Sequence, residues 1–346
     1  MGRDASTRVT PTTTDNIVDF GVSAYYTQGG FLGTLTSTPN FMNNQKVEKI
    51  TDNSTTHPLA YQSGWKYTPI KYWPNNENDK VAFFAYSPYA ESNKMTTFNA
   101  AQPYPSFAIS DGTDFLWATP IESGKQNVND NVCFNFQHIM SRVAFSVEAM
   151  VDKVNTDNNG DLENDDTQDE NIDSGTEIVV TEVKLSGNLV TSGSVTWKKT
   201  NDVWESSQTD DNAVAKTHTL VESNFIGSEM STNGNVKGQK VTKDEVALSN
   251  ANSYLMLVPQ TVNVTIEVKY SVITTDTALA EGYSKVNNTT STTFNMTFNK
   301  GQAYNFCLHI GMSSVKLSAT VTEWSTNQDV VVNVPINEKT QTGGTN

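Results

Sequence analysis

Apolar and polar side chains alternate with a period of two along much of the second half of the chain. In the clearest run, residues 262–272, every second side chain is apolar. The same period recurs at residues 179–185, 304–310 and 315–321. Because successive side chains of an extended strand point to opposite faces, each run predicts a strand with one buried face.

Helical periodicity is scarce. A single short helix is predicted at residues 242–249, where Thr242 and Glu245 have the spacing of a capping box. The predicted strands are short and separated by clusters of Gly, Asn, Pro and Ser, which is typical of an antiparallel sandwich or barrel. The sequence therefore predicts an all-β protein.

The parity of the apolar positions changes near residue 140. Phe134, Phe136 and His138 share one face of a strand, whereas the apolar residues from Val143 onward occupy the opposite parity. One regular strand cannot bury both sets on the same side. We therefore expect a bulge or break between His138 and Arg142.

The chain has 346 residues, which suits two domains of ordinary size. Residues 151–176 are strongly acidic and have almost no side chains to bury. Such a run predicts a solvated linker or loop. We therefore predict an N-terminal domain at residues 1–155, an acidic linker at 156–176 and a C-terminal domain at 177–346.

The acidic run also contains the one candidate cofactor site. Its spacing is close to that of a calcium-binding loop, with candidate ligands Asp157, Asn159, Asp161, Glu163 and Asp166. Asn155 replaces the usual Asp of the first position, and Asp166 replaces the usual bidentate Glu. A solvated linker without calcium is the alternative, and no other cofactor is predicted.

Charge and composition exclude several classes of protein. The formal net charge of -15 removes the electrostatic basis for binding nucleic acid. No apolar stretch approaches the roughly 18 residues of a membrane-spanning helix, and the abundance of Thr, Asn and Ser suits a secreted or surface protein. Cys133 and Cys307 are too few for a disulfide framework, so we predict buried free thiols.

Catalytic motifs are not found. The chain contains no GxSxG, P-loop or GxGxxG sequence. Its four histidines stand singly, without the spacing of a zinc site, and His309 is predicted on a strand surface. We therefore predict that the protein is not an enzyme.

Six phrases, taken in order, resemble the fimbrillin family of Bacteroidales. They are FGVSAYY at 20–26, YWP at 72–74, VAFFAYSP at 81–88, FNFQHIMSRV at 134–143, YLMLVPQ at 254–260 and GQAY at 301–304. The resemblance covers residues 18–325. It implies two tandem transthyretin-like antiparallel β-sandwich domains, exported as a lipoprotein precursor to the outer membrane and serving cell adhesion in a fimbrium.

The resemblance also implies assembly by strand exchange with other fimbrial subunits. In the family, a protease that cuts after arginine removes an N-terminal strand, and a C-terminal strand of another subunit fills the groove. Arg8 lies in a polar segment ahead of the first strand and is the candidate cleavage site, since Arg3 is nearly terminal and Arg142 belongs to a buried-looking strand. A surface charge on a frayed terminus is the alternative.

The C-terminal segment 330–336 has the pattern of a donated strand. Its alternate positions carry four apolar anchors, Val330, Val332, Val334 and Ile336. At roughly 1.5 to 3 kcal/mol for each buried anchor, four would contribute about 6 to 12 kcal/mol before ordering entropy is subtracted. The alternative is an ordinary last strand paired within its own chain.

A second hypothesis is a monomeric outer-surface lipoprotein that binds a glycan or host ligand. It rests on an aromatic cluster, Tyr61, Trp65, Tyr67, Tyr72 and Trp73. Exposed aromatic rings can stack on sugars, but packing within the protein is their commoner role in β proteins. Neither hypothesis identifies the surface ligand.

Overall fold

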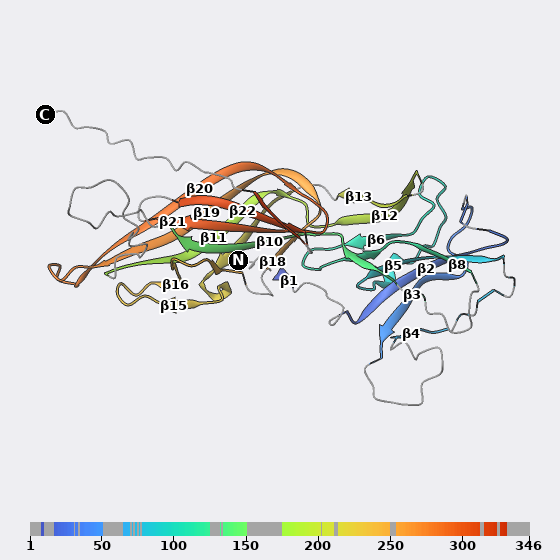
Figure 1. Ribbon diagram of the computed structural model, residues 1–346, viewed down its shortest axis with the longest axis horizontal. Helices are drawn as coiled ribbons and strands as arrows, with labels where there is room; N and C mark the ends of the chain where they lie inside the picture. The colour runs from blue at the N-terminus through green and yellow to red at the C-terminus, as the bar shows by residue number, and fades with distance from the viewer. Residues whose placement is uncertain are drawn as a thin grey trace, which may run out of the picture.

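The computed structural model shows an elongated all-β molecule in which two sandwiches lie end to end (Figure 1). The structure describes residues 8–9, 17–30, 32–33, 35–50, 65–69, 71, 73–74, 76, 78–124, 132, 134–150, 175–201, 203–210, 214–249, 254–311, 315–323 and 326–330. Within these ranges there is no α-helix, which confirms the predicted fold class. No helix among the described residues has the length and apolar character needed to cross a membrane.

One sandwich is built mainly from the first half of the chain. Its larger sheet, the amino-terminal sheet, has the strand order β4-β3-β2-β5-β7-β9, with β8 also paired to β5. The bounds are β2 Asp19–Thr27, β3 Met42–Lys49, β4 Trp65–Lys66, β5 Lys80–Ser87, β7 Leu116–Ala118, β8 Ile121–Gly124 and β9 Phe136–His138. The facing sheet contains β6 Ser106–Ile109, β12 Gly193–Thr200 and β13 Val203–Asp210, and a 3-10 turn, η2, spans Glu91–Asn93.

The other sandwich is built mainly from the second half. Its first sheet, the carboxy-terminal sheet, has the order β1-β18-β10-β21-β22-β23, with β17 also paired to β10. Its strands are β1 Arg8–Val9, β10 Ser141–Ala149, β17 Val246–Ala247, β18 Tyr254–Leu257, β21 Gln302–Ile310, β22 Val315–Glu323 and β23 Thr326–Val330. The facing sheet contains β11 Thr176–Leu189, β14 Val214–Val221, β15 Ser228–Met230, β16 Lys237–Lys240, β19 Gln260–Thr275 and β20 Tyr283–Phe298; η3 spans Glu222–Asn224.

The pairing is antiparallel throughout the described strands, except that β10 and β21 run parallel. The predicted helix at 242–249 is wrong. The segment forms the short strand β17 beside β10, and the Thr242 hydroxyl donates a hydrogen bond to the Asp244 carbonyl, 2.9 Å away, instead of capping a helix. Val246 and Leu248 have the i, i+2 spacing of a strand, and Leu248 is buried.

Alternation predicts the core of the second sandwich well. In β19, Val264, Ile266, Val268, Tyr270 and Val272 are buried against the facing sheet. The apolar faces of β21 and β22 enter the same core. Each of these strands buries one face, as its sequence pattern predicts.

The run at 179–185 departs from its predicted face. The pairing of β11 with β19 shifts between Val180 and Glu182, which is the signature of a β-bulge. As a result Ile178 and Val180, rather than Val179, share the core with Val183 and Leu185. The simple alternation predicted for this run is therefore wrong at its first residue.

The amino-terminal sheet is buried on both faces. Ala82, Phe84 and Tyr86 of β5 pack toward β6 and β12, while Val81 and Phe83 pack into a second cluster on the opposite face. This explains why the sequence of β5 is a continuous apolar run without alternation. A strand that is buried on both sides has no polar face.

The two sandwiches exchange strands. The extended segment is interrupted between His138, the last residue of β9, and Ser141, the first residue of β10, which confirms the predicted break. There it passes from the amino-terminal sheet into the carboxy-terminal sheet. Later in the chain β12 returns to pair with β6. Most of the predicted linker 156–176 lies outside the described residues, and the domain boundaries stay a prediction.

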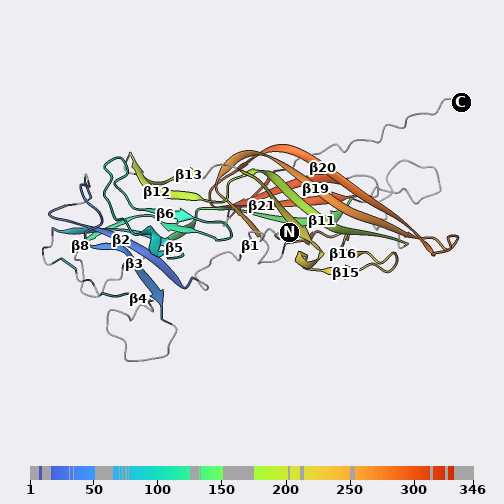
Figure 2. The ribbon, with the colours of Figure 1, turned by 180° about the vertical axis from the view of Figure 1, so that it is seen from behind.

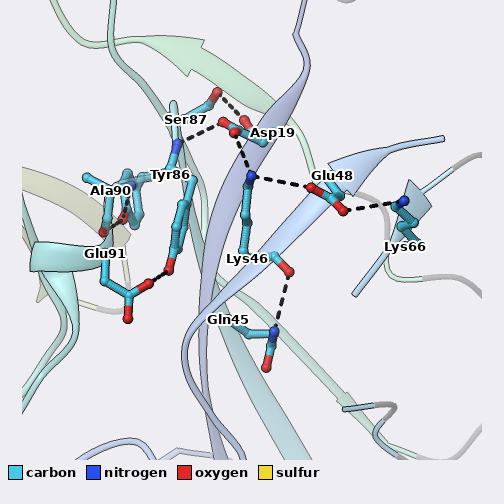
Figure 3. Close-up of polar contacts among 10 residues, drawn as sticks. Asp19, Gln45, Lys46, Glu48, Lys66, Tyr86, Ser87, Ala90 and Glu91 are labelled. Atoms are coloured by element: carbon cyan, nitrogen blue, oxygen red, sulfur yellow. Dashed lines mark hydrogen bonds and ion pairs between the residues drawn. The ribbon is translucent and has the colours of Figure 1, made fainter. Parts of the chain in front are cut away.

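A polar cluster covers the beginning of β2 (Figure 3). The Lys46 ammonium lies 3.5 Å from the Asp19 carboxylate and 3.3 Å from that of Glu48. The Ser87 hydroxyl donates to the Asp19 carbonyl at 2.8 Å, and the Tyr89 amide donates to the Asp19 carboxylate at 3.1 Å. Asp19 therefore joins β2 to its two neighbours, β3 and the end of β5.

Candidate functional site

The candidate cleavage residue, Arg8, lies in a strand at the edge of the carboxy-terminal sheet. The backbone of β1 pairs antiparallel with β18, with Arg8 opposite Leu255 and Val9 opposite Tyr254. Both ribbon views place β1 near the middle of the long axis, between the two sandwiches (Figure 2). An edge strand held by two residue pairs can be lost without breaking the rest of the sheet.

The strand beneath it, β18, serves both sandwiches. Leu255 and Leu257 are buried in the core of the carboxy-terminal sandwich, whereas Met256 and the following residue, Val258, are buried in the core of the amino-terminal sandwich. Alternation explains this division, because successive side chains leave a strand on opposite sides. β18 is therefore the strand on which both cores meet.

The other two arginines differ in placement. Arg142 belongs to β10, which is paired on one side with β18 and on the other with β21. Its guanidinium lies 4.5 Å from the centre of the Tyr254 ring, within the range of a cation–π contact. Arg3 lies outside the described residues.

The candidate donor segment begins at the opposite edge of the same sheet. The backbone of β23 pairs with β22 from Thr326, opposite Glu323, to Val330, opposite Ala319. Val332, Val334 and Ile336 lie outside the described residues. The sheet thus ends in β1 on one side and in β23 on the other.

The calcium candidates, Asp157, Asn159, Asp161, Glu163 and Asp166, also lie outside the described residues, and calcium stays a prediction.

A different group of possible metal ligands lies on the outer face of the carboxy-terminal sheet. The thiol of Cys307, the imidazole of His309 and the carboxylate of Glu148 have ligand atoms within 4.8 Å of one another. The sequence pattern predicts His309 on a strand surface and Cys307 as a buried thiol, but it does not indicate that Glu148 of β10 joins them.

The aromatic cluster is packed where it is described. The Trp65 ring lies 5.1 Å from that of Phe20, and the Trp73 ring lies 5.9 Å from that of Phe83, both edge-on. Tyr67 packs against the same cluster. Tyr61 and Tyr72 lie outside the described residues. Packing against the amino-terminal sheet therefore accounts for Trp65, Tyr67 and Trp73.

Known proteins resemble this chain over most of its length. It is 24% identical over 369 residues to the fimbrium subunit Fim1C of Phocaeicola vulgatus, covering 96% of this chain and 89% of that protein. A crystal structure of a fimbrial protein from Bacteroides vulgatus superposes with a TM-score of 0.63 at 20% identity, covering 88% of this chain and 93% of that chain. That similarity shows a shared fold.

The sequence profile of the fimbrillin-like family matches residues 7–324, nearly the whole chain. The match includes β1, the shared strand β18 and β22, and it ends just before the edge strand β23. The chain therefore belongs to the fimbrillin-like family, whose members are structural subunits of cell-surface fimbriae and not enzymes.

Proposed function

We propose that this fimbrial subunit assembles by strand exchange after proteolysis at Arg8. We also propose that its sandwiches are tandem transthyretin-like domains built mainly from residues 1–155 and 177–346, with β1 and β10 contributed to the second sandwich and β12 and β13 to the first. The observation that carries the proposal is the pairing of β1 with β18 at a sheet edge, between two cores. A strand in this position can be exchanged without dismantling either core.

Cleavage after Arg8 cuts through β1. Loss of that strand frees the backbone groups of Tyr254 and Leu255 on the outer edge of β18. An unpaired edge is a template for a strand from another chain, and main-chain hydrogen bonds then supply much of the affinity. The edge of β18 is the acceptor in this proposal.

The donor is the segment 330–336 of another subunit. Val330, Val332, Val334 and Ile336 supply the apolar anchors, and Pro335 lacks an amide hydrogen, which limits pairing on one side. Val330 is paired with Ala319 of β22 in its own chain, so donation of the segment exchanges this pairing for one with the partner. An alternative is that the whole segment pairs within its own chain.

The proposal includes the route to the cell surface. We place the subunit in a fimbrium at the outer membrane, exported as a lipid-anchored precursor, with other fimbrial subunits as its partners. Adhesion is the function of the assembled fimbrium, and its ligand is a host or bacterial surface.

The proposal is tested by treating the full chain with an arginine-specific protease and measuring polymers by size-exclusion chromatography and electron microscopy. Wild-type protein should polymerise after cleavage. Arg8→Lys should block both cleavage and polymerisation, whereas Arg3→Lys should leave both intact. Deletion of the residues after Gln328 should allow cleavage but prevent polymers, and polymers formed by the deleted chain would refute the donor segment.

The same protein preparations distinguish the second hypothesis, a monomeric glycan-binding lipoprotein, from assembly by strand exchange. Glycan-array binding by an intact chain that never polymerises would favour it. The half-buried packing of Trp65 and Trp73 against Phe20 and Phe83 weighs against a sugar-stacking role for these two rings.

A further inference from the structure

A thiol, an imidazole and a carboxylate meet on the outward face of the carboxy-terminal sheet. Strand register brings them together: Glu148 of β10 lies opposite His309 of β21, and Cys307 lies two residues before His309 on the same face. Ser146 and Ser318 lie opposite Cys307 on the two neighbouring strands. The group is separate from both edge strands.

The donor set matches a particular class of metal ion. Thiolate sulfur and imidazole nitrogen favour Zn²⁺ among the common divalent ions, and a carboxylate oxygen completes three protein ligands. A tetrahedral Zn²⁺ requires about 3.5 Å between sulfur and nitrogen or oxygen, and about 3.3 Å between nitrogen and oxygen, given its usual bond lengths. The ligand atoms lie within 4.8 Å of one another, so rotamer changes can bring them to these separations.

The surroundings are polar and ordered. His309 Nδ1 lies 2.6 Å from the Glu148 carboxylate, and His309 Nε2 lies 2.6 Å from the Ser318 hydroxyl. Asn305 donates to the Ser146 hydroxyl at 2.7 Å and to the Glu245 carboxylate at 2.9 Å. An ion would replace one histidine contact and keep the other as an orienting contact.

The thiol is sheltered although it is on the outward face. Cys307 is only 4% exposed. The side chains of Ser146 and Ser318 and the carboxylates of Glu245 and Glu148 lie around this thiol. Lys316 of β22 lies opposite His309 and is exposed. A divalent cation would relieve the accumulated negative charge.

We infer that Glu148, Cys307 and His309 form a Zn²⁺ site that cross-links β10 to β21. Binding forms the Zn–S bond as the Cys307 S–H bond breaks and its proton passes to solvent, while the imidazole binds in its neutral form. The fourth position takes water, while the Ser318 hydroxyl keeps its hydrogen bond to His309. The ion would fasten a strand of the first half of the chain to one of the last strands.

The test uses Co²⁺ as a spectroscopic substitute for Zn²⁺, added to the full-length, metal-stripped protein. Thiolate coordination produces a sulfur-to-cobalt charge-transfer band, and Zn²⁺ should abolish the band by displacement. Cys307→Ala should lose the band completely. Cys133→Ala, which removes the other cysteine, is the matched control and should keep it.

His309→Gln and Glu148→Gln should each weaken Co²⁺ binding by at least about tenfold. Circular dichroism of the metal-free variants checks that each is folded. Zn²⁺ should raise the Tm of the wild type and of Cys133→Ala but not of Cys307→Ala. A folded wild-type protein without the band, or a band that survives Cys307→Ala, would overturn the inference and leave a hydrogen-bonded network only.

Discussion

Two central strands of the large sheets, β5 and β21, differ in what their second face carries. The amino-terminal sheet packs Phe84 into one core and its neighbour Phe83 into another on the opposite side. The carboxy-terminal sheet buries Phe306, whereas its neighbour Asn305 lies on the outward face among hydrogen-bonding side chains. β5, which packs apolar side chains on both faces, is thus sensitive at every position, whereas β21 carries polar side chains at alternate positions.

The largest predicted effect tests this contrast with neighbouring residues. Phe83→Ala and Phe84→Ala should each lower the free energy of unfolding by about 3 to 5 kcal/mol, because each leaves a cavity in a core. Phe306→Ala should cost about as much, but Asn305→Ala only about 1 kcal/mol, since it loses hydrogen bonds at a partly exposed site. Urea denaturation followed by fluorescence measures all four. A Phe83→Ala variant as mild as Asn305→Ala would break the comparison.

A smaller effect concerns ion pairs on an outer face of the carboxy-terminal sandwich. Burial disfavours ionisation of Glu182, but hydrogen bonds from Lys184 and Lys269, each with Nζ 2.8 Å from the carboxylate, outweigh it and lower the pKa. The contribution to stability is then present above the ordinary glutamate pKa and is lost as pH falls through the lowered value.

Glu182→Gln should therefore cost about 0.5 kcal/mol at neutral pH and approach zero cost in strong acid. Thermal denaturation between pH 7 and 3 measures the difference. Glu229→Gln, at a more exposed carboxylate, controls for the general loss of one negative charge. An equal cost at all pH values would contradict the role assigned to ionised Glu182.

The smallest effect is predicted at the polar cluster of Figure 3. The ammonium of Lys46 is well exposed, and exposed ion pairs contribute little because water and salt screen them. Lys46→Met should leave the Tm unchanged within error in differential scanning calorimetry. A clear drop in Tm would mean that these contacts, rather than the two buried faces, hold β2 and β3 together.

The strands that expose one face to solvent could be predicted from the sequence. β19 could be predicted because polar residues mark its outer face, and the break after His138 could be predicted because parity changes there. The bulge near Thr181 could not be predicted, because Val179 and Val183 are both apolar and fit the alternation of a regular strand as well as that of a bulged one. The false helix at 242–249 shows that capping spacing without an apolar helical face is a weak signal.

The candidate sites show a similar division. Arg8 could be singled out because arginine is rare, and the segment 330–336 because its apolar residues alternate. The contact of Glu148 with His309 joins residues 161 positions apart through a parallel pair of strands, and nothing local in either segment indicates the other. Pairing of this kind follows from topology, which only the folded structure supplies.

The exchange of strands between the sandwiches has a consequence for how the chain folds. β10 requires β21 as its neighbour, and β6 requires β12, so neither sandwich has all its strands when the first half of the chain has been made. Pairing over such separations is slow, because loop closure precedes the stabilising contacts. The nascent amino-terminal half must therefore wait for the rest of the chain before its own sandwich has all its strands.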